Sequence, residues 1–165
     1  MSVYRQGHVG VGLLLYAPVA YAALSAGRSV LAVAGFAVMI WLAMLPDVDL
    51  RLPFVSHRGP THTLGFAAVV GLGCGSAGWF LGSGLAEFEP QLLGGFGFGL
   101  GALAVVAHLV ADWLTPMGIA PLWPLSSARF SLGFARASST LANGFLLVVG
   151  IGAMAAVLWV TGLIG

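Results

Sequence analysis

The stretch LLGGFGFGLGALAVVAHLVADWLT spans residues 92–115, and only one histidine and one carboxylate, both near its end, interrupt its apolar character. About 20 consecutive apolar residues are enough for a helix to cross the hydrocarbon core of a bilayer. Runs of the same kind occur at residues 8–26, 29–45, 62–83 and 140–164. The sequence therefore predicts an all-α integral membrane bundle of about five transmembrane helices.

The composition of the whole chain agrees with a membrane environment. Hydrophobic residues make up 59% of the 165 residues, and charged residues make up only 7%, whereas a soluble domain carries about 25% charged residues. About five spans with short connections would use nearly all of residues 1–165, which predicts a single transmembrane domain. A membrane barrel would instead show short strands of alternating polarity.

Charge and cysteine content exclude several classes of function. The net charge is +1, from six arginines and five acidic residues. Nucleic-acid binding requires a basic stripe, so no nucleic-acid partner is expected. The single cysteine, Cys74, excludes an internal disulfide and argues against a thiolate metal cluster.

Glycines recur at the four-residue spacing that allows transmembrane helices to approach closely. The pairs are Gly71 with Gly75, Gly78 with Gly82, Gly95 with Gly99, and Gly97 with Gly101. Because these glycines lie within apolar runs and the chain has no lysine, a phosphate-binding glycine loop is not expected. The pattern indicates helix packing.

The first apolar run has a second interpretation, as a secretory signal. Arg5 precedes it, and Ala20-Tyr21-Ala22 has the small-x-small form of a cleavage site. Cleavage would discard His8, which resembles the other histidines in its predicted position. We therefore favour a helix that is retained.

Helices that cross a bilayer one after another place alternate connections on the same side. The amino-terminal residues, loop 46–61 and loop 116–139 then share one side, here called the near side. Five of the six arginines fall on it and only Arg28 falls on the far side; the five are Arg5, Arg51, Arg58, Arg129 and Arg136. Because cytoplasmic loops are rich in arginine, we expect a multi-pass membrane protein whose near side faces the cytoplasm.

All four histidines and all three aspartates are predicted to gather at the near side. They are His8, Asp47, Asp49, His57, His62, His108 and Asp112. In this arrangement His8 begins the first span and His62 opens the third. Ionisable groups at membrane depth are candidates for function, so the sequence predicts a polar site at one membrane face.

These residue types suit a metal. His108 and Asp112 are four residues apart on a predicted helix, which places them on one face as two ligands, or as a ligand and the group that orients it. Imidazoles and carboxylates without a thiolate suit zinc, manganese or iron. All seven residues are therefore predicted to bind or orient a divalent metal, with zinc favoured and one or two ions expected.

Catalysis is predicted to involve Asp49, Arg58 and Asp112. A catalytic metal activates water and polarises a phosphoryl oxygen, while one aspartate could act as general base. Arg58 could hold a phosphate by paired hydrogen bonds, and Arg51 is a weaker candidate for that role. The remaining near-side arginines of loop 116–139 are expected to set topology and contact lipid headgroups.

Several motifs together resemble a known family. They are His8 before an apolar run, Leu45-Pro46-Asp47-Val48-Asp49, His57-Arg58-Gly59-Pro60-Thr61-His62-Thr63, and His108-Leu109-Val110-Ala111-Asp112-Trp113-Leu114-Thr115-Pro116-Met117-Gly118. From His8 to Gly118 the chain resembles the YdjM-like family of inner-membrane metal-dependent hydrolases. The resemblance implies a membrane-embedded enzyme with bound metal. By analogy with phospholipase C enzymes, it implies substrates of the phospholipid type.

The favoured function is a hydrolase for a lipid phosphoester at the cytoplasmic interface, which lipid would reach sideways from the bilayer. A metal-ion transporter or sensor is the main alternative, although it would need polar residues that continue toward the far side. A haem-binding subunit does not explain three carboxylates, and an interaction protein is also left open.

Residues 116–139 form either a lid or an interfacial loop. The oligomeric state is not predicted.

Overall fold

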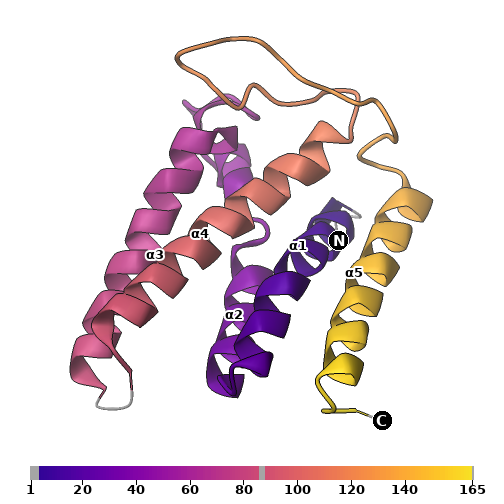
Figure 1. Ribbon diagram of the computed structural model, residues 1–165. Helices are drawn as coiled ribbons and strands as arrows, with labels where there is room; N and C mark the ends of the chain where they lie inside the picture. Colours follow the sequence, from indigo (N-terminus) through magenta and orange to yellow (C-terminus); the bar gives the residue numbers. More distant parts are fainter. Residues whose placement is uncertain (1–3, 86–87, 165) are drawn as a thin grey trace.

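The computed structural model describes residues 4–85 and 88–164 and contains five long helices (Figure 1). They are α1 (Tyr4–Ser25), α2 (Ser29–Leu42), α3 (Leu64–Gly84), α4 (Pro90–Trp113) and α5 (Thr140–Val160). All five lie in segments long and apolar enough to cross a membrane. In the described ranges the only β-structure is a single bridge between Ile119 and Phe130. The prediction of an all-α membrane bundle of five helices is confirmed.

Two helix boundaries differ from the predicted spans in a way that affects the polar residues. Helix α1 begins at Tyr4, so His8 lies one turn inside the helix rather than at its start. Helix α3 begins at Leu64, because the Thr63 side chain accepts a hydrogen bond from the Phe66 amide and caps the helix there. The prediction that His62 opens the third span was therefore wrong.

Two short 3-10 helices lie between α2 and α3. The first, η1 (Pro46–Arg51), carries Asp47 and Asp49, and the second, η2 (Pro60–His62), carries His62. A proline occupies the beginning of each, where its fixed φ suits a helical turn and its missing amide hydrogen is not needed. These turns therefore carry three of the predicted donors on backbone that is helical but outside the long helices.

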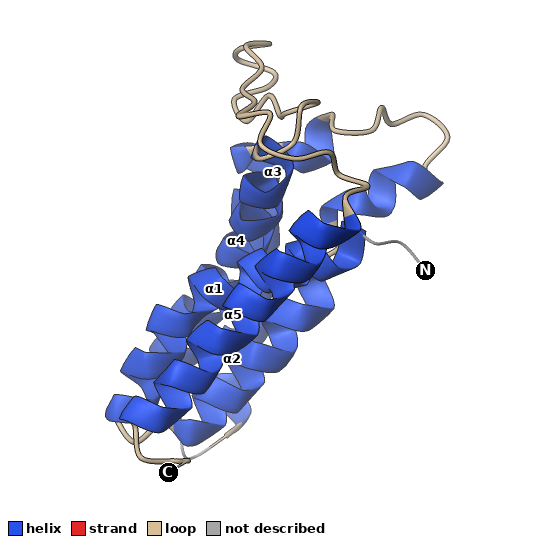
Figure 2. Cartoon of the chain, turned by 90° about the vertical axis from the view of Figure 1, so that its right-hand side faces the viewer, coloured by secondary structure: helices blue, strands red, loops and turns tan. Residues whose placement is uncertain are grey.

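The helices form two groups that meet through α4. Helix α3 packs along α4, while α1 packs against α5, α2 and α4 (Figures 1 and 2). The start of α1, the segment 43–63, and loop 114–139 lie at the same end of the bundle, here called the near end (Figure 1). The predicted alternation of the chain therefore holds in the structure.

Glycines allow close backbone contact within both groups. A Cβ atom on Gly97 would lie 2.5 Å from the Cys74 carbonyl oxygen, and one on Gly101 would lie 2.8 Å from that of Val70. Apart from neighbouring residues of α4, no atom lies within 4 Å of such a position on Gly99 or on Gly95. The pair Gly97 and Gly101 therefore packs on α3, whereas the predicted pair Gly95 and Gly99 faces away from it.

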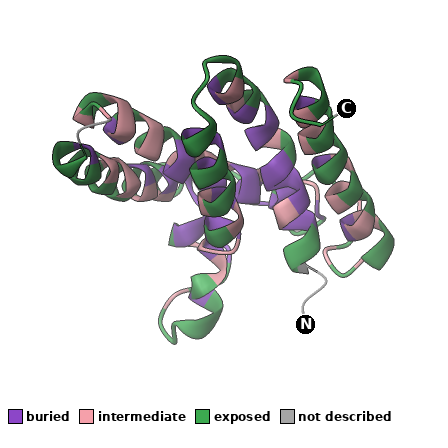
Figure 3. Cartoon of the chain, turned by 90° about the horizontal axis from the view of Figure 1, so that it is seen from below, coloured by how far each residue is buried: buried purple, intermediate pink, exposed green. Residues whose placement is uncertain are grey.

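Buried residues line the interior of the bundle and exposed residues cover its outside (Figure 3). Tyr16, Met39, Leu100 and Ala104 belong to the main core between α1, α2 and α4. Many large apolar side chains face outward instead, among them Trp41, which is 80% exposed. An apolar exterior of this extent suits contact with lipid chains.

Candidate metal centre

The seven predicted donors meet at the near end of the bundle. They form three groups in which the ligand atoms lie within 4.8 Å of one another: His8 with His108 and Asp112, Asp47 with His62 and His108, and Asp49 with His57 and His62. Because His62 and His108 each belong to two groups, the three groups make one connected set, which we call the His-Asp cluster. The cluster could hold a metal ion.

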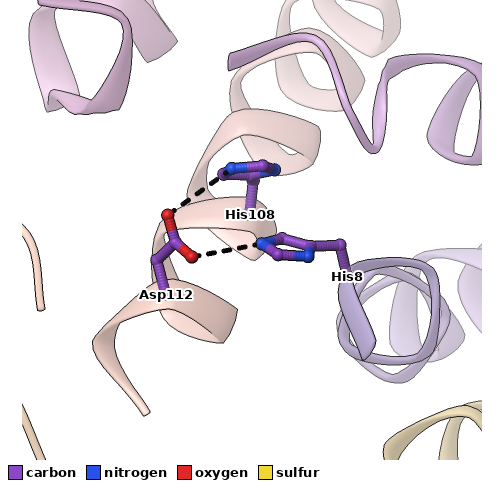
Figure 4. A group of neighbouring side chains, drawn as sticks. All are labelled: His8, His108 and Asp112. Atoms are coloured by element: carbon purple, nitrogen blue, oxygen red, sulfur yellow. Dashed lines mark ion pairs between the residues drawn. The ribbon is translucent and has the colours of Figure 1, made fainter. Parts of the chain in front are cut away.

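Helices α1 and α4 supply one edge of the cluster (Figure 4). His108 and Asp112 stand one turn apart on α4, and both are buried. From α1, His8 places its Nε2 atom 3.3 Å from Asp112 Oδ1, and its ring centroid lies 4.0 Å from that of His108. The close packing of α1 against α4 thus brings a histidine from the first helix to the ligand pair predicted on the fourth.

The protonation of His108 follows from its backbone contact. Its Nδ1 atom lies 2.8 Å from the carbonyl oxygen of Ala43. A carbonyl only accepts hydrogen bonds, so Nδ1 carries the proton, and in the neutral ring Nε2 has a free lone pair. That lone pair faces His62 Nε2 at 3.2 Å and Asp47 Oδ1 at 3.5 Å. His108 is therefore oriented as a metal ligand through Nε2.

His62 is fully buried and is oriented in the same manner by a carboxylate. Its Nδ1 atom lies 3.2 Å from Asp49 Oδ2, and Nε2 points to Asp112 Oδ2 at 3.3 Å. Burial by itself would lower the pKa of His62, but hydrogen bonds to Asp112 and Asp47 outweigh it and raise the pKa to about 9. The carboxylates thus stabilise a cation at this position, as a metal-binding site must.

Asp49 is held by several groups of the polar turn. Its Oδ2 atom accepts hydrogen bonds from the Arg58 amide at 3.0 Å and from Thr61 Oγ1 at 2.9 Å. Its Oδ1 atom lies 3.0 Å from His57 Nδ1. Both oxygens of Asp49 therefore have partners within the protein, and the carboxylate is placed to orient His62 and His57.

Arg58 is buried and binds the protein rather than solvent. Its Nη2 donates to Asp112 Oδ1 at 2.5 Å, and its Nη1 donates to Thr115 Oγ1 at 2.8 Å and to the Gly118 carbonyl at 3.2 Å. Arg58 has φ of 58°, a left-handed conformation that is costly for a residue with a side chain. In this conformation the turn directs the guanidinium at Asp112. Fewer of its N–H groups therefore remain for the phosphate contact that the sequence predicted.

The distances between the donor atoms can be compared with those expected in a metal site. Around Asp47 Oδ1, His62 Nε2, His108 Nε2 and Asp112 Oδ2, five of the separations are between 3.2 and 3.6 Å. Donors about 2.0–2.1 Å from a tetrahedral zinc lie about 3.3 Å apart. Asp112 Oδ2 is also buried, and it faces the Nε2 atoms of His62 and His108. The donor set and its spacing fit a divalent ion.

A cavity of about 1080 Å³ adjoins the cluster. Of the cluster residues, His8, Asp47, His57 and Asp112 line it, together with Arg58. Asp49 does not line this cavity, which agrees with a role in orienting its neighbours. A substrate in the cavity would therefore meet His8, Asp47, His57 and Asp112 rather than the buried rings of His62 and His108.

Sequence reasoning did not assign roles to two threonines and one carbonyl. Thr61 binds Asp49, and Thr115 binds Arg58. Both threonines lie inside the motifs quoted above, so their position in those motifs was a usable signal. The Ala43 carbonyl that orients His108 had no such signal, because every residue carries a carbonyl.

Fold and site together define a multi-pass membrane protein with a buried cluster of histidines and aspartates at one end of its bundle. The chain belongs to the YdjM inner membrane protein family, whose family model matches residues 3–164. Membership confirms the resemblance seen in the motifs, and with the five spans it makes this a multi-pass inner-membrane protein. Comparisons with curated proteins and with solved structures found no match.

Proposed function

We propose that this protein is a metal-dependent hydrolase that acts on a lipid phosphoester at the cytoplasmic face of the inner membrane. One observation carries the proposal: the His-Asp cluster adjoins a large cavity whose lining also includes apolar residues of α2 and of the segment after it. A cavity lined by both polar and apolar side chains suits a molecule with a polar head and an apolar body. Lipid is such a molecule, and it surrounds the protein.

The residues that would hold the metal are those whose lone pairs converge. They are Asp47, His62, His108 and Asp112, with His8 beside Asp112. Zinc is favoured by the nitrogen and oxygen donors, with manganese and iron as alternatives, and the overlapping groups suit one or two ions. A metal bound there would supply a Lewis acid that polarises a phosphoryl oxygen and acidifies water.

Asp49 of the cluster and Arg58 beside it would hold these ligands in place. Asp49 fixes the ring of His62, and Arg58 fixes the carboxylate of Asp112 through a charged hydrogen bond. Asp112 lines the cavity, whereas Asp49 is surrounded by its own partners and does not line it. Of the two aspartates predicted to be catalytic, we therefore favour Asp112 as the one that acts beside the reacting atoms, as a ligand of the metal.

The positions of the arginines support the proposed cytoplasmic orientation. Arg5 is in the first turn of α1, Arg51 ends η1, and Arg136 precedes α5, all at the near end. Arg28 lies in the turn between α1 and α2, at the other end. The positive-inside rule then supports a near end, and a cluster, that face the cytoplasm.

Ion transport is less well supported by the distribution of polar groups. In the described part of the chain the buried polar and charged side chains belong to the near end; they are His8, Asp49, Arg58, Thr61, His62, Thr63, His108, Asp112, Thr115 and Asn143. An ion that crossed the bundle would need polar partners at the far end too. The cluster is therefore better suited to reaction than to passage.

Metal-loaded protein in mixed micelles is expected to release phosphate-containing products from a mixture of phospholipids, detected by mass spectrometry. The Asp112→Asn variant keeps the side-chain shape but removes the charge of a metal ligand, so the rate should fall at least about 100-fold. Protein that binds metal normally yet cleaves no lipid phosphoester would refute the proposed function.

A further inference from the structure

Three arginines line the cavity beside the cluster. Arg5 comes from α1, Arg51 from the end of η1, and Arg136 from the loop before α5. All three are exposed, and no hydrogen bond or ion pair joins their side chains to any residue in the described ranges. Three distant parts of the chain thus direct unpaired positive charge toward one cavity.

The cluster does not need these arginines for charge balance. Its three carboxylates, on Asp47, Asp49 and Asp112, carry three negative charges, and the buried guanidinium of Arg58, which is ion-paired with Asp112, balances one of them. One divalent ion in the cluster would supply the remaining two positive charges. The three outer arginines would then give the cavity a net positive charge that only an anionic ligand could balance.

Another part of the cavity is apolar. Ile40 and Trp41 from the last turn of α2, and Met44 and Leu45 from the residues that follow, line it. Trp41 is 80% exposed on the lipid-facing outside of the bundle. The cavity therefore extends from the arginines and the cluster to a surface that lipid chains can reach, which is the shape and polarity of a site for a whole lipid rather than a soluble phosphate.

We infer that this cavity binds a lipid phosphomonoester, with Arg5, Arg51 and Arg136 as the residues that select its headgroup. A phosphomonoester carries close to two negative charges near neutral pH, and guanidinium groups bind phosphate oxygens in pairs. A zwitterionic diester such as phosphatidylcholine would instead bring an ammonium group among three arginines. The inference rests on the proposed function and specifies its substrate class.

Hydrolysis of such a substrate needs no reactant other than water. A water oxygen forms a bond to phosphorus, the bond from phosphorus to the lipid oxygen breaks, and a proton passes to that oxygen. The products are inorganic phosphate and a neutral lipid alcohol. The alcohol has lost the charge that the arginines recognise, so it would leave sideways into the bilayer.

Binding can be measured without turnover by using a lipid phosphonate, in which a methylene group replaces the ester oxygen. Metal-loaded protein in detergent should bind it more tightly than phosphatidylcholine, and inorganic phosphate should compete only weakly. Arg51→Gln and Arg136→Gln should each weaken phosphonate binding about tenfold, because each removes charged hydrogen bonds. The matched control is Arg28→Gln, an exposed far-end arginine whose loss should leave binding unchanged.

Unchanged phosphonate binding in the Arg51→Gln, Arg136→Gln double variant would overturn the inference, and so would equal binding of phosphatidylcholine by the native protein. Orthophosphate that binds as tightly as the phosphonate would overturn the lipid part of it. Failure of the proposed function looks different: phosphonate binding would depend on the arginines while no lipid ester was cleaved. Because the three arginines are exposed, the variants should keep the native melting temperature.

Discussion

Replacing His62 by glutamine is expected to lower the affinity for zinc more than 100-fold and to abolish hydrolysis. Changes in groups that merely orient a ligand cost about 10–100-fold, and His62 directs its own Nε2 atom at Asp47, His108 and Asp112. Zinc affinity can be measured by competition with a chromophoric chelator in detergent. Hydrolysis is followed on the same preparation.

The matched control for this prediction is His57→Gln, in the same polar turn. His57 is exposed, and its Nδ1 atom contacts Asp49, which is itself held by other groups. We expect this variant to lose no more than about tenfold in zinc affinity. Equal losses in the two variants would contradict the assignment of His62 as a central ligand.

Replacing Arg58 by methionine is expected to destabilise the metal-free protein by about 3–5 kcal/mol. The buried guanidinium is hydrogen-bonded to Asp112, Thr115 and the Gly118 carbonyl, so its removal leaves a buried carboxylate without its ion-pair partner. Unfolding in detergent, followed by circular dichroism, measures the loss. Added zinc should restore part of the stability, because the ion would compensate the same carboxylate and bind only the folded state.

Arg129→Met is the control for this loss. Arg129 is exposed, and its contacts with the Met117 and Gly118 carbonyls are long, at 3.4 Å. A surface change of this kind should alter the free energy of unfolding by less than about 0.5 kcal/mol. If Arg58→Met were as stable as Arg129→Met, Arg58 would not be the structural partner of Asp112 that we describe.

Most of the fold and the membership of the cluster could be predicted from the sequence, for a simple physical reason. An apolar chain in a bilayer can carry ionised groups only near helix ends or paired inside the bundle. Once the spans alternate, His8, His57 and Asp112 must therefore come to the same end. The structure adds that His8 and Asp112 belong to one group of possible ligands, and that His57 joins the same cluster through His62.

The internal organisation of the cluster could not be predicted in the same way. The sequence suggested that Arg58 holds a phosphate, yet the left-handed turn at this residue directs its guanidinium to Asp112. The direction of a side chain depends on the path of its loop, which spacing does not specify. The tautomer of His108 depends on the Ala43 carbonyl, which carries no sequence signal.

The face of α4 that packs on α3 could not be predicted from the sequence either. The pairs Gly95 with Gly99 and Gly97 with Gly101 have identical spacing, but only the second pair contacts α3. Small residues at this spacing allow close approach, whereas the position of the partner helix decides which face uses it. Similarly, Arg5 and Arg136 were indistinguishable from ordinary topology-setting arginines until the cavity placed them beside the cluster.

The most direct test of the central claim, that the His-Asp cluster is a metal centre, is elemental analysis of the native protein after chelator treatment and reloading with zinc, manganese or iron. The same analysis of a His62→Ala, His108→Ala double variant provides the comparison. We predict about one or two equivalents of metal per native chain, and none in the variant. Native protein that holds no metal after reloading would contradict the metal centre and the hydrolase mechanism built on it.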